Sequence, residues 1–238
     1  MSYSISVVIP TLNEADCIEQ AIASIRQHHD DPSRLDIIIA DGGSGDPTVD
    51  KALGCGVRVI QAPLGRAHQM NAGAEIATGE ILLFLHADTK LPPQFATHIT
   101  EVLGRPRAIA GAFELQIDGS DRRLRWVEWG VKWRSRLNQM PYGDQALFMR
   151  SEIFHQVGGF PPLPILEDVE MVKRLKRIGR IYIAPAAVRT SARRWQRLGI
   201  VRTTLLNQLV LLAFWLGVPT DRIAYWYRTA PKRWGRSR

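Results

Sequence analysis

The sequence predicts an α/β domain built on a mostly parallel sheet, and three observations carry this prediction. Residues 81–85 are five consecutive large apolar residues, as in strands that are buried on both faces. Two more apolar runs, at residues 5–9 and 35–40, end in polar turns, and helical patterns separate the strands. Because parallel strands need crossover helices, this alternation indicates a doubly wound, nucleotide-binding half. A length of 238 residues suits one large domain.

The first half of the chain reads as strand–helix units. The strand at residues 5–9 ends at Pro10, and Asn13 is a candidate cap for the next helix, with Asp16 in its first turn. Three isoleucines at helical spacing give that helix an apolar face: Ile18, Ile22 and Ile25. The strand at residues 35–40 ends in a glycine-rich turn, after which Pro47 is a suitable first helical residue.

The strand that follows the small-residue helix at 65–74 ends abruptly at His86 and Asp88. Because these residues are two apart, they lie on one face of the extended chain, at the sheet edge where open α/β sheets bind ligands. An imidazole and a carboxylate there could bind a divalent cation that neutralises a diphosphate. A strand end with an Asp that caps a turn is the structural alternative.

The second half is less regular. Residues 122–137 are basic and contain three tryptophans, and we favour an amphipathic helix there over a clamp for a lipid phosphate. The remaining expected elements are strands at 57–60, 108–117, 146–149 and 180–183 and helices at 167–178, 198–216 and 221–227.

The charge is unevenly distributed. Residues 171–238 carry a net charge of +15 and residues 1–170 a net charge of −7, which suggests an anionic partner surface. Membrane lipid and a phosphorylated substrate are candidates, whereas no zinc-finger, helix-turn-helix or RNA-recognition pattern supports nucleic acid. The apolar stretch 203–218 is shorter than the roughly 20 residues of a spanning helix. It is therefore either a helix packed on the core or an interfacial segment on anionic lipid.

The two cysteines, Cys17 and Cys55, lack metal-type spacing and follow no secretory signal. We expect reduced thiols in a cytoplasmic protein, which leaves open peripheral association with the inner face of the membrane. The N-terminus enters a strand at once, so no targeting peptide is expected.

Polar residues gather at five places: residues 10–14, 41–44, 86–88, 142–145 and the pair Glu167-Asp168. The first three end strands of one parallel sheet, so they converge on one edge. Each has a structural alternative, such as a helix cap for Asn13, a turn former for Asp41 and first-turn acids for the pair. Their joint convergence favours a functional site.

On these residues the chain resembles the inverting family-2 glycosyltransferases of GT-A fold. The matching segments, in order, are VIPTLNE at 8–14, DGGSGD at 41–46, HAD at 86–88 and ED at 167–168. GRAHQMN at 65–71, YGDQ at 142–145 and YWYR at 225–228 are similar to a compact bacterial subgroup, some members of which are associated with arsenosugar biosynthesis. The resemblance implies a GT-A domain at 1–197, with a nucleotide-binding half (1–104) and an acceptor half (105–197), and a helical extension at 198–238.

The resemblance also implies roles on the donor side. Thr11, Glu14 and Asp41 would hold the uracil and ribose of a UDP-sugar. Asp88 matches the last acid of the family's Asp-X-Asp motif and would bind Mn²⁺ or Mg²⁺ through the diphosphate. His86 replaces the first Asp, and because hard cations prefer oxygen ligands, it is expected to contact the sugar-nucleotide rather than the metal. Further expected donor contacts are Pro10, Asn13, Ser44, Arg66, Asn71, Ala87 and Glu167.

On the acceptor side, Asp168 matches the acid that acts as general base on an acceptor hydroxyl. Asp144 and Gln145 would line the acceptor side, and Asp144 is the second candidate for the base. Arg193 or Arg194, next to Trp195, resembles the segment that neutralises the leaving diphosphate.

We therefore predict a metal-dependent, inverting transfer of sugar from a nucleotide sugar to a small-molecule or lipid-linked hydroxyl. A sugar nucleotidyltransferase is the first alternative, but the Gly-rich, Lys/Arg-bearing loop it would show after the first strand is missing. A non-catalytic sugar-nucleotide or membrane-binding module is the second, and His86 is its only support. An oxidoreductase is disfavoured, since no G-x-G-x-x-G follows the first strand.

Overall fold

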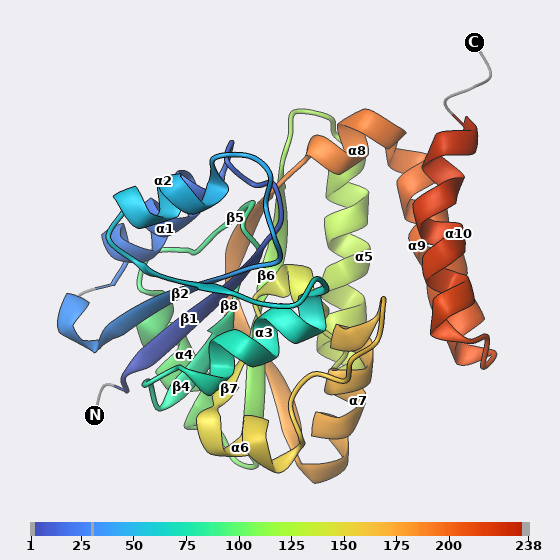
Figure 1. Ribbon diagram of the computed structural model, residues 1–238. Helices are drawn as coiled ribbons and strands as arrows, with labels where there is room; N and C mark the ends of the chain where they lie inside the picture. Colours follow the sequence, from blue (N-terminus) through green and yellow to red (C-terminus); the bar gives the residue numbers. More distant parts are fainter. Residues whose placement is uncertain (1–2, 30, 235–238) are drawn as a thin grey trace.

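The computed structural model describes residues 3–29 and 31–234, which form a mixed sheet with helices on both faces (Figure 1). The strand order is β3-β2-β1-β4-β7-β6-β8-β5. The strands are β1 (Ile5–Thr11), β2 (Leu35–Asp41), β3 (Arg58–Gln61), β4 (Ile81–Phe84), β5 (Thr89–Lys90), β6 (Ala108–Asp118), β7 (Phe148–Arg150) and β8 (Arg180–Ser191). The helices are α1 (Ile18–Gln27), α2 (Thr48–Gly54), α3 (Arg66–Glu75), α4 (Phe95–Leu103), α5 (Arg123–Asn138), α6 (Ser151–Gln156), α7 (Glu167–Ile178), α8 (Arg193–Leu198), α9 (Ile200–Trp215) and α10 (Thr220–Trp234), with 3-10 turns η1 (Pro32–Arg34) and η2 (Gly143–Gln145).

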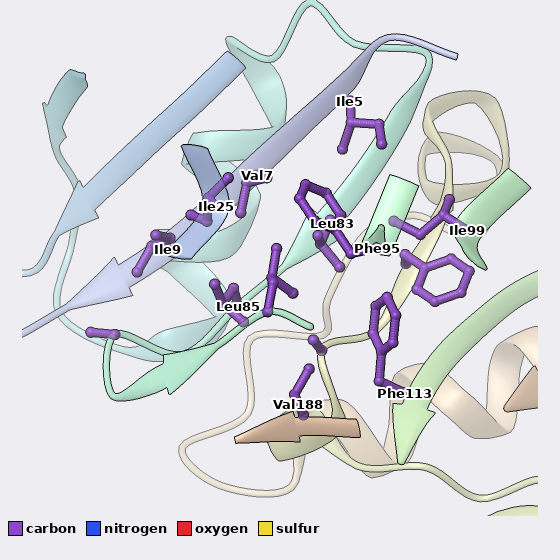
Figure 2. Packing of buried hydrophobic residues seen from close by; sticks show 14 of the residues in the cluster. Ile5, Val7, Ile9, Ile25, Leu83, Leu85, Phe95, Ile99, Phe113 and Val188 are labelled. Carbon is purple, nitrogen blue, oxygen red and sulfur yellow. The ribbon is translucent and has the colours of Figure 1, made fainter. Parts of the chain in front are cut away.

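Strands β3, β2, β1 and β4 are mutually parallel, which confirms the doubly wound first half. Their side chains alternate between two cores. Ile5, Val7 and Ile9 face the core beneath α1 and α4, where Leu83 and Phe95 also lie (Figure 2). The intervening Val8 faces the core beneath α3 on the other side of the sheet.

Strand β4 is buried on both faces, as predicted, with all four residues at most 3% exposed. It pairs in parallel with β1 but antiparallel with β7, so it marks the change of direction in the sheet. The sheet is mostly parallel, because four of its seven strand pairings are.

Helix α3 lies as close to the sheet as its small residues predict. A Cβ on Gly73 would come within 2.4 Å of Val8 Cγ1, so only glycine fits there. This contact sets how closely α3, the helix that begins at Arg66, packs on β1.

Several predicted boundaries are wrong, for identifiable reasons. Pro10 lies within β1, paired with Ala40, rather than ending the strand. Asn13 does not cap α1, which begins at Ile18; it adopts a left-handed φ of 56° and accepts a hydrogen bond from the Gly45 N–H (2.8 Å). Strand β8 continues well past residue 183, because a register shift between Ile183 and Ala187 accommodates Pro185 beside β6.

The C-terminal helices α9 and α10 pack against each other and against the α7 side of the molecule (Figure 1). Leu206, Val210 and Ile223 are buried there, so the prediction of a helix packed on the core is confirmed for this face. Along the described part of the chain, no helix has the length and apolar character needed to cross a membrane.

Candidate active site

Asp41 joins the ends of β1 and β2. Its carboxylate accepts hydrogen bonds from Thr11 Oγ1 (2.9 Å) and from the N–H groups of Gly43 (2.9 Å) and Ser44 (2.8 Å). Burial opposes ionisation, but the bonds from Ser44, Thr11 and Gly43 outweigh it and lower the pKa of Asp41. The residue is 1% exposed, so in this conformation it shapes the loops around the predicted uracil and ribose site.

The loop after β1 is fixed by reciprocal polar contacts. The Asn13 N–H donates to Ser44 Oγ (2.9 Å), next to the bond from Gly45 to Asn13. Gln69, which sequence reasoning missed, donates from Nε2 to the carbonyls of Thr11 (2.7 Å) and Ala40 (2.9 Å). The sequence signal for this role is only a Gln within a small-residue helix; its burial is seen in the structure.

Arg193 bridges two expected donor-binding acids. Its Nη2 lies 2.8 Å from Glu14 Oε2 and 3.6 Å from Asp88 Oδ2. The arginine-tryptophan segment is therefore beside the strand ends, and its role at the leaving diphosphate stays a prediction. Ala87, between His86 and Asp88, is buried and anchors this turn in the core.

His86 and Asp168 meet across Gly143. Asp168 Oδ2 accepts the Gly143 N–H (2.7 Å), and its Oδ1 accepts the Val169 N–H (2.8 Å). A Cβ on Gly143 would lie 3.2 Å from both Asp168 Oδ2 and His86 Nε2, so a glycine allows this approach. Burial and the nearby Arg66 guanidinium lower the pKa of His86, which favours the neutral imidazole.

Two further carboxyl groups lie beside this pair. Burial raises the pKa of Asp144, and its Oδ1 is buried without a hydrogen-bond partner among the residues described. Glu167 is 2% exposed, and its Oε1 forms an ion pair with Arg66 Nε (2.8 Å). Burial raises the pKa of Glu167 in spite of this partner.

His86, Asp144 and Asp168, but not Glu167, line a cleft of about 540 Å³. Residues from both halves of the chain meet there: Arg66, His86, Asp88, Asp144, Asp168 and Arg194. A second cavity, of about 190 Å³, holds Arg193 and shares Asp88 with the first. Asp88 thus stands where the two cavities adjoin.

Asp88 fits a hard cation, although the side chains do not form a complete cage. Within residues 3–29 and 31–234, no three His, Cys, Asp or Glu side chains are grouped to hold a metal. The Asp88 side chain is 28% exposed and offers carboxylate oxygens to the cleft. Mg²⁺ at phosphate sites is commonly held by one or two carboxylates plus substrate phosphates and water, and one carboxylate suits that arrangement.

Gln145 and Asn71 fasten loops instead of lining the cleft. Gln145 is fully buried and donates to the Phe113 carbonyl (2.8 Å), and Asn71 binds both the N–H (2.9 Å) and the carbonyl (2.8 Å) of Phe160. Their expected contacts with substrate stay predictions. In contrast, the Arg134 guanidinium lies 3.6 Å over the Tyr142 ring in the cleft and was not predicted.

Comparison with known proteins gives consistent matches. The model of the family "Glycosyl transferase family 2" matches residues 6–160. An uncharacterized glycosyltransferase of Mycobacterium tuberculosis H37Rv is 28% identical over 181 residues, which are 72% of this chain and 68% of the relative.

Two solved structures share the fold. The mannosyltransferase PcManGT from Pyrobaculum calidifontis, in complex with GDP-Man and Mn²⁺, matches with a TM-score of 0.65 at 20% identity. Staphylococcus aureus TarS, in complex with UDP, matches with a TM-score of 0.63 at 18% identity. The matches cover 85% and 79% of this chain but only 63% and 60% of those chains, so this chain spans less than two thirds of either structure.

Proposed function

The chain belongs to glycosyltransferase family 2 and has the GT-A fold, and from this premise we propose that it transfers a sugar from a UDP-sugar to an acceptor hydroxyl with inversion at the anomeric carbon. One observation carries the proposal. Asp88, His86, Asp144 and Asp168, which come from three separate segments, converge at one end of a single cleft.

The donor would lie over the ends of β1, β2 and β4. Glu14 and the loops fixed by Thr11 and Asp41 would take the uridine. The guanidinium groups of Arg66 and Arg194 line the same cleft, where fixed positive charge stabilises the diphosphate as it leaves. A divalent cation held by Asp88 would supply Lewis-acid neutralisation of that diphosphate.

Asp168 is the proposed general base. It takes the proton of the acceptor hydroxyl while the oxygen forms a bond to the anomeric carbon, and the bond from that carbon to the diphosphate breaks, its electron pair leaving with UDP. The two backbone N–H groups on its oxygens hold the carboxylate in place. Burial raises the pKa of Asp144, which favours its protonated form. A general base must be ionised, so the raised pKa makes Asp144 less suited to that role.

We further propose that the division at residues 104 and 197 is functional, with the donor bound by 1–104 and the acceptor by 105–197. The extension at 198–238 would associate with the inner face of a membrane. Along α9 and at its C-terminal cap, apolar residues at helical spacing are 56–74% exposed: Val201, Leu205, Leu209, Leu212 and the cap residue Leu216. Arg197, Arg202 and Arg222 are exposed nearby, and cations beside an apolar face suit anionic lipid.

Turnover of a nucleotide-sugar panel tests the proposal. UDP-sugars with Mn²⁺ should release UDP, chelation should stop the release, and proton NMR of the product should show inverted anomeric configuration. Retained configuration would contradict the in-line mechanism. Formation of a UDP-sugar from UTP and a sugar 1-phosphate would favour the nucleotidyltransferase alternative.

A further inference from the structure

The cleft extends from the carboxyl groups into a section formed by two helix faces. Helices α5 and α9 run side by side (Figure 1). The cleft-lining residues of α5 are Trp126, Val127, Gly130, Val131 and Arg134, and those of α9 are Thr204, Asn207, Gln208, Val210 and Leu211. Their spacing by three, four and seven residues places each set on one face of its helix.

The walls of this section are mainly apolar. Leu115, Val131, Ile165, Leu166 and Val169 are buried and line it, and Trp126 stands at the rim with 76% of its surface exposed. Two polar side chains in the walls, Arg134 and Thr204, already have partners within the chain.

Three contacts show this. Arg134 lies over the Tyr142 ring and donates to the Met140 carbonyl (3.1 Å). Thr204 Oγ1 donates to the Ile200 carbonyl (2.8 Å). The Asn207 and Gln208 side-chain amides on α9 have no hydrogen-bond partner among the described residues, so they are left to meet a polar group of a ligand.

We propose that the acceptor carries its hydroxyl on an apolar body, aliphatic or aromatic, which lies between α5 and α9 while the hydroxyl reaches Asp168. This rests on the proposed function and names the substrate class of the same site. A volume of about 540 Å³ is in the range of small-molecule pockets, so a compact apolar group fits. A purely polyhydroxylated acceptor would leave its hydroxyls against Leu115, Val131 and Val169 without partners.

Gly130 offers a precise way to block this section. It lies in the middle of the lining face of α5, is exposed, and a Cβ there meets nothing within 4 Å. Gly130→Leu therefore adds an apolar side chain at the cleft lining, starting from a Cβ that meets no protein atom, and leucine is a better helix former than glycine. Gly54→Leu, at the end of α2, is the matched control, since a Cβ there also meets nothing within 4 Å.

The experiment is calorimetric titration of the full chain. UDP with Mn²⁺ is titrated first; absence of binding would count against the proposed function itself. The UDP-saturated protein is then titrated with methyl, phenyl and octyl β-D-glucosides below micellar concentrations. Because each buried methylene contributes about four-fold in affinity, octyl or phenyl glucoside should bind at least ten-fold more tightly than methyl glucoside. The tighter of the two identifies an aliphatic or an aromatic body.

Gly130→Leu should weaken the tighter glucoside at least ten-fold, and Gly54→Leu should not. Val127→Gln, which makes a half-buried wall polar, should weaken it too and covers the case in which Gly130→Leu fails to fold. Equal affinity for all three glucosides, or binding of none while UDP binds, would overturn the inference. Unchanged octyl binding in a folded Gly130→Leu would do the same, because the chain would then sit outside the cleft.

Discussion

Asp168→Asn keeps the size of the side chain and removes its ability to take a proton. Transfer should therefore fall by about two to four decades, the usual contribution of a general base. The structure adds a second consequence. Asp168 accepts the Gly143 N–H (2.7 Å) on one oxygen and the Val169 N–H (2.8 Å) on the other, whereas Asn has one acceptor oxygen. One backbone N–H loses its partner, at a cost of about 1–3 kcal/mol.

Transfer and binding must be measured on the same variant. UDP release under saturating UDP-sugar gives the loss in kcat, calorimetry gives the affinity for UDP, and a thermal scan should show Tm lowered by about 2–12 °C. Asp50→Asn, the same change at an exposed position of α2, should leave all three unchanged. Normal turnover with weakened nucleotide binding would refute the assignment, and Asp144 would become the better candidate for the base.

Three other predictions follow from the same geometry. Asp88→Ala should abolish turnover and EDTA should mimic it, with the fold intact by circular dichroism; full activity of the variant in chelator would remove Asp88 from the metal site. The pKa of His86 is lowered in the folded state, so the contribution of His86 to stability is complete above the unfolded-state pKa of about 6.5. This contribution is lost as pH falls below about 6.5, at about 1.4 kcal/mol per pH unit, until the folded-state pKa is reached. As pH falls from 7.5 to 5.5 the wild type should thus lose Tm that His86→Gln keeps, and parallel profiles would contradict this. Co-sedimentation with anionic liposomes should be salt-sensitive and should be lost when Leu205, Leu209 and Leu212 are all changed to Glu. The control variant Leu53→Glu should still co-sediment. Equal recovery in the supernatant with and without lipid would show that the α9 face does not bind membrane.

The sequence predicts what local patterns determine. The apolar run of β4 predicts its burial on both faces, and parallel strands bring Thr11, Asp41 and Asp88 to one edge of the sheet. These positions therefore follow from the order of the strands along the chain and from the period of the hydrophobic pattern. The roles of residues that act through packing between distant elements cannot be predicted from such local patterns. The roles of Gln69 and Gly130 depend on where α3 and α9 lie, which no single segment encodes.

Polar residues inside a recognisable motif are hard to orient from sequence. Gln145 and Asn71 both belong to segments on which the resemblance to the family rests, yet their amides hold the Phe113 and Phe160 backbone groups. In the same way, Pro185 interrupts the apolar pattern of β8, and only the register shift beside β6 shows that the strand continues.

Thermal unfolding with a panel of UDP- and GDP-sugars in Mn²⁺ tests the central claim most directly, because a ligand that binds only the folded chain stabilises it. At one hundred times its Kd, a UDP-sugar should add about 2.7 kcal/mol to the free energy of unfolding and raise Tm by about 5–10 °C. The same addition should leave Asp88→Ala unchanged. If no nucleotide sugar shifts the transition, or if the shift is equally large in Asp88→Ala, the proposed donor site at the end of β4 is contradicted.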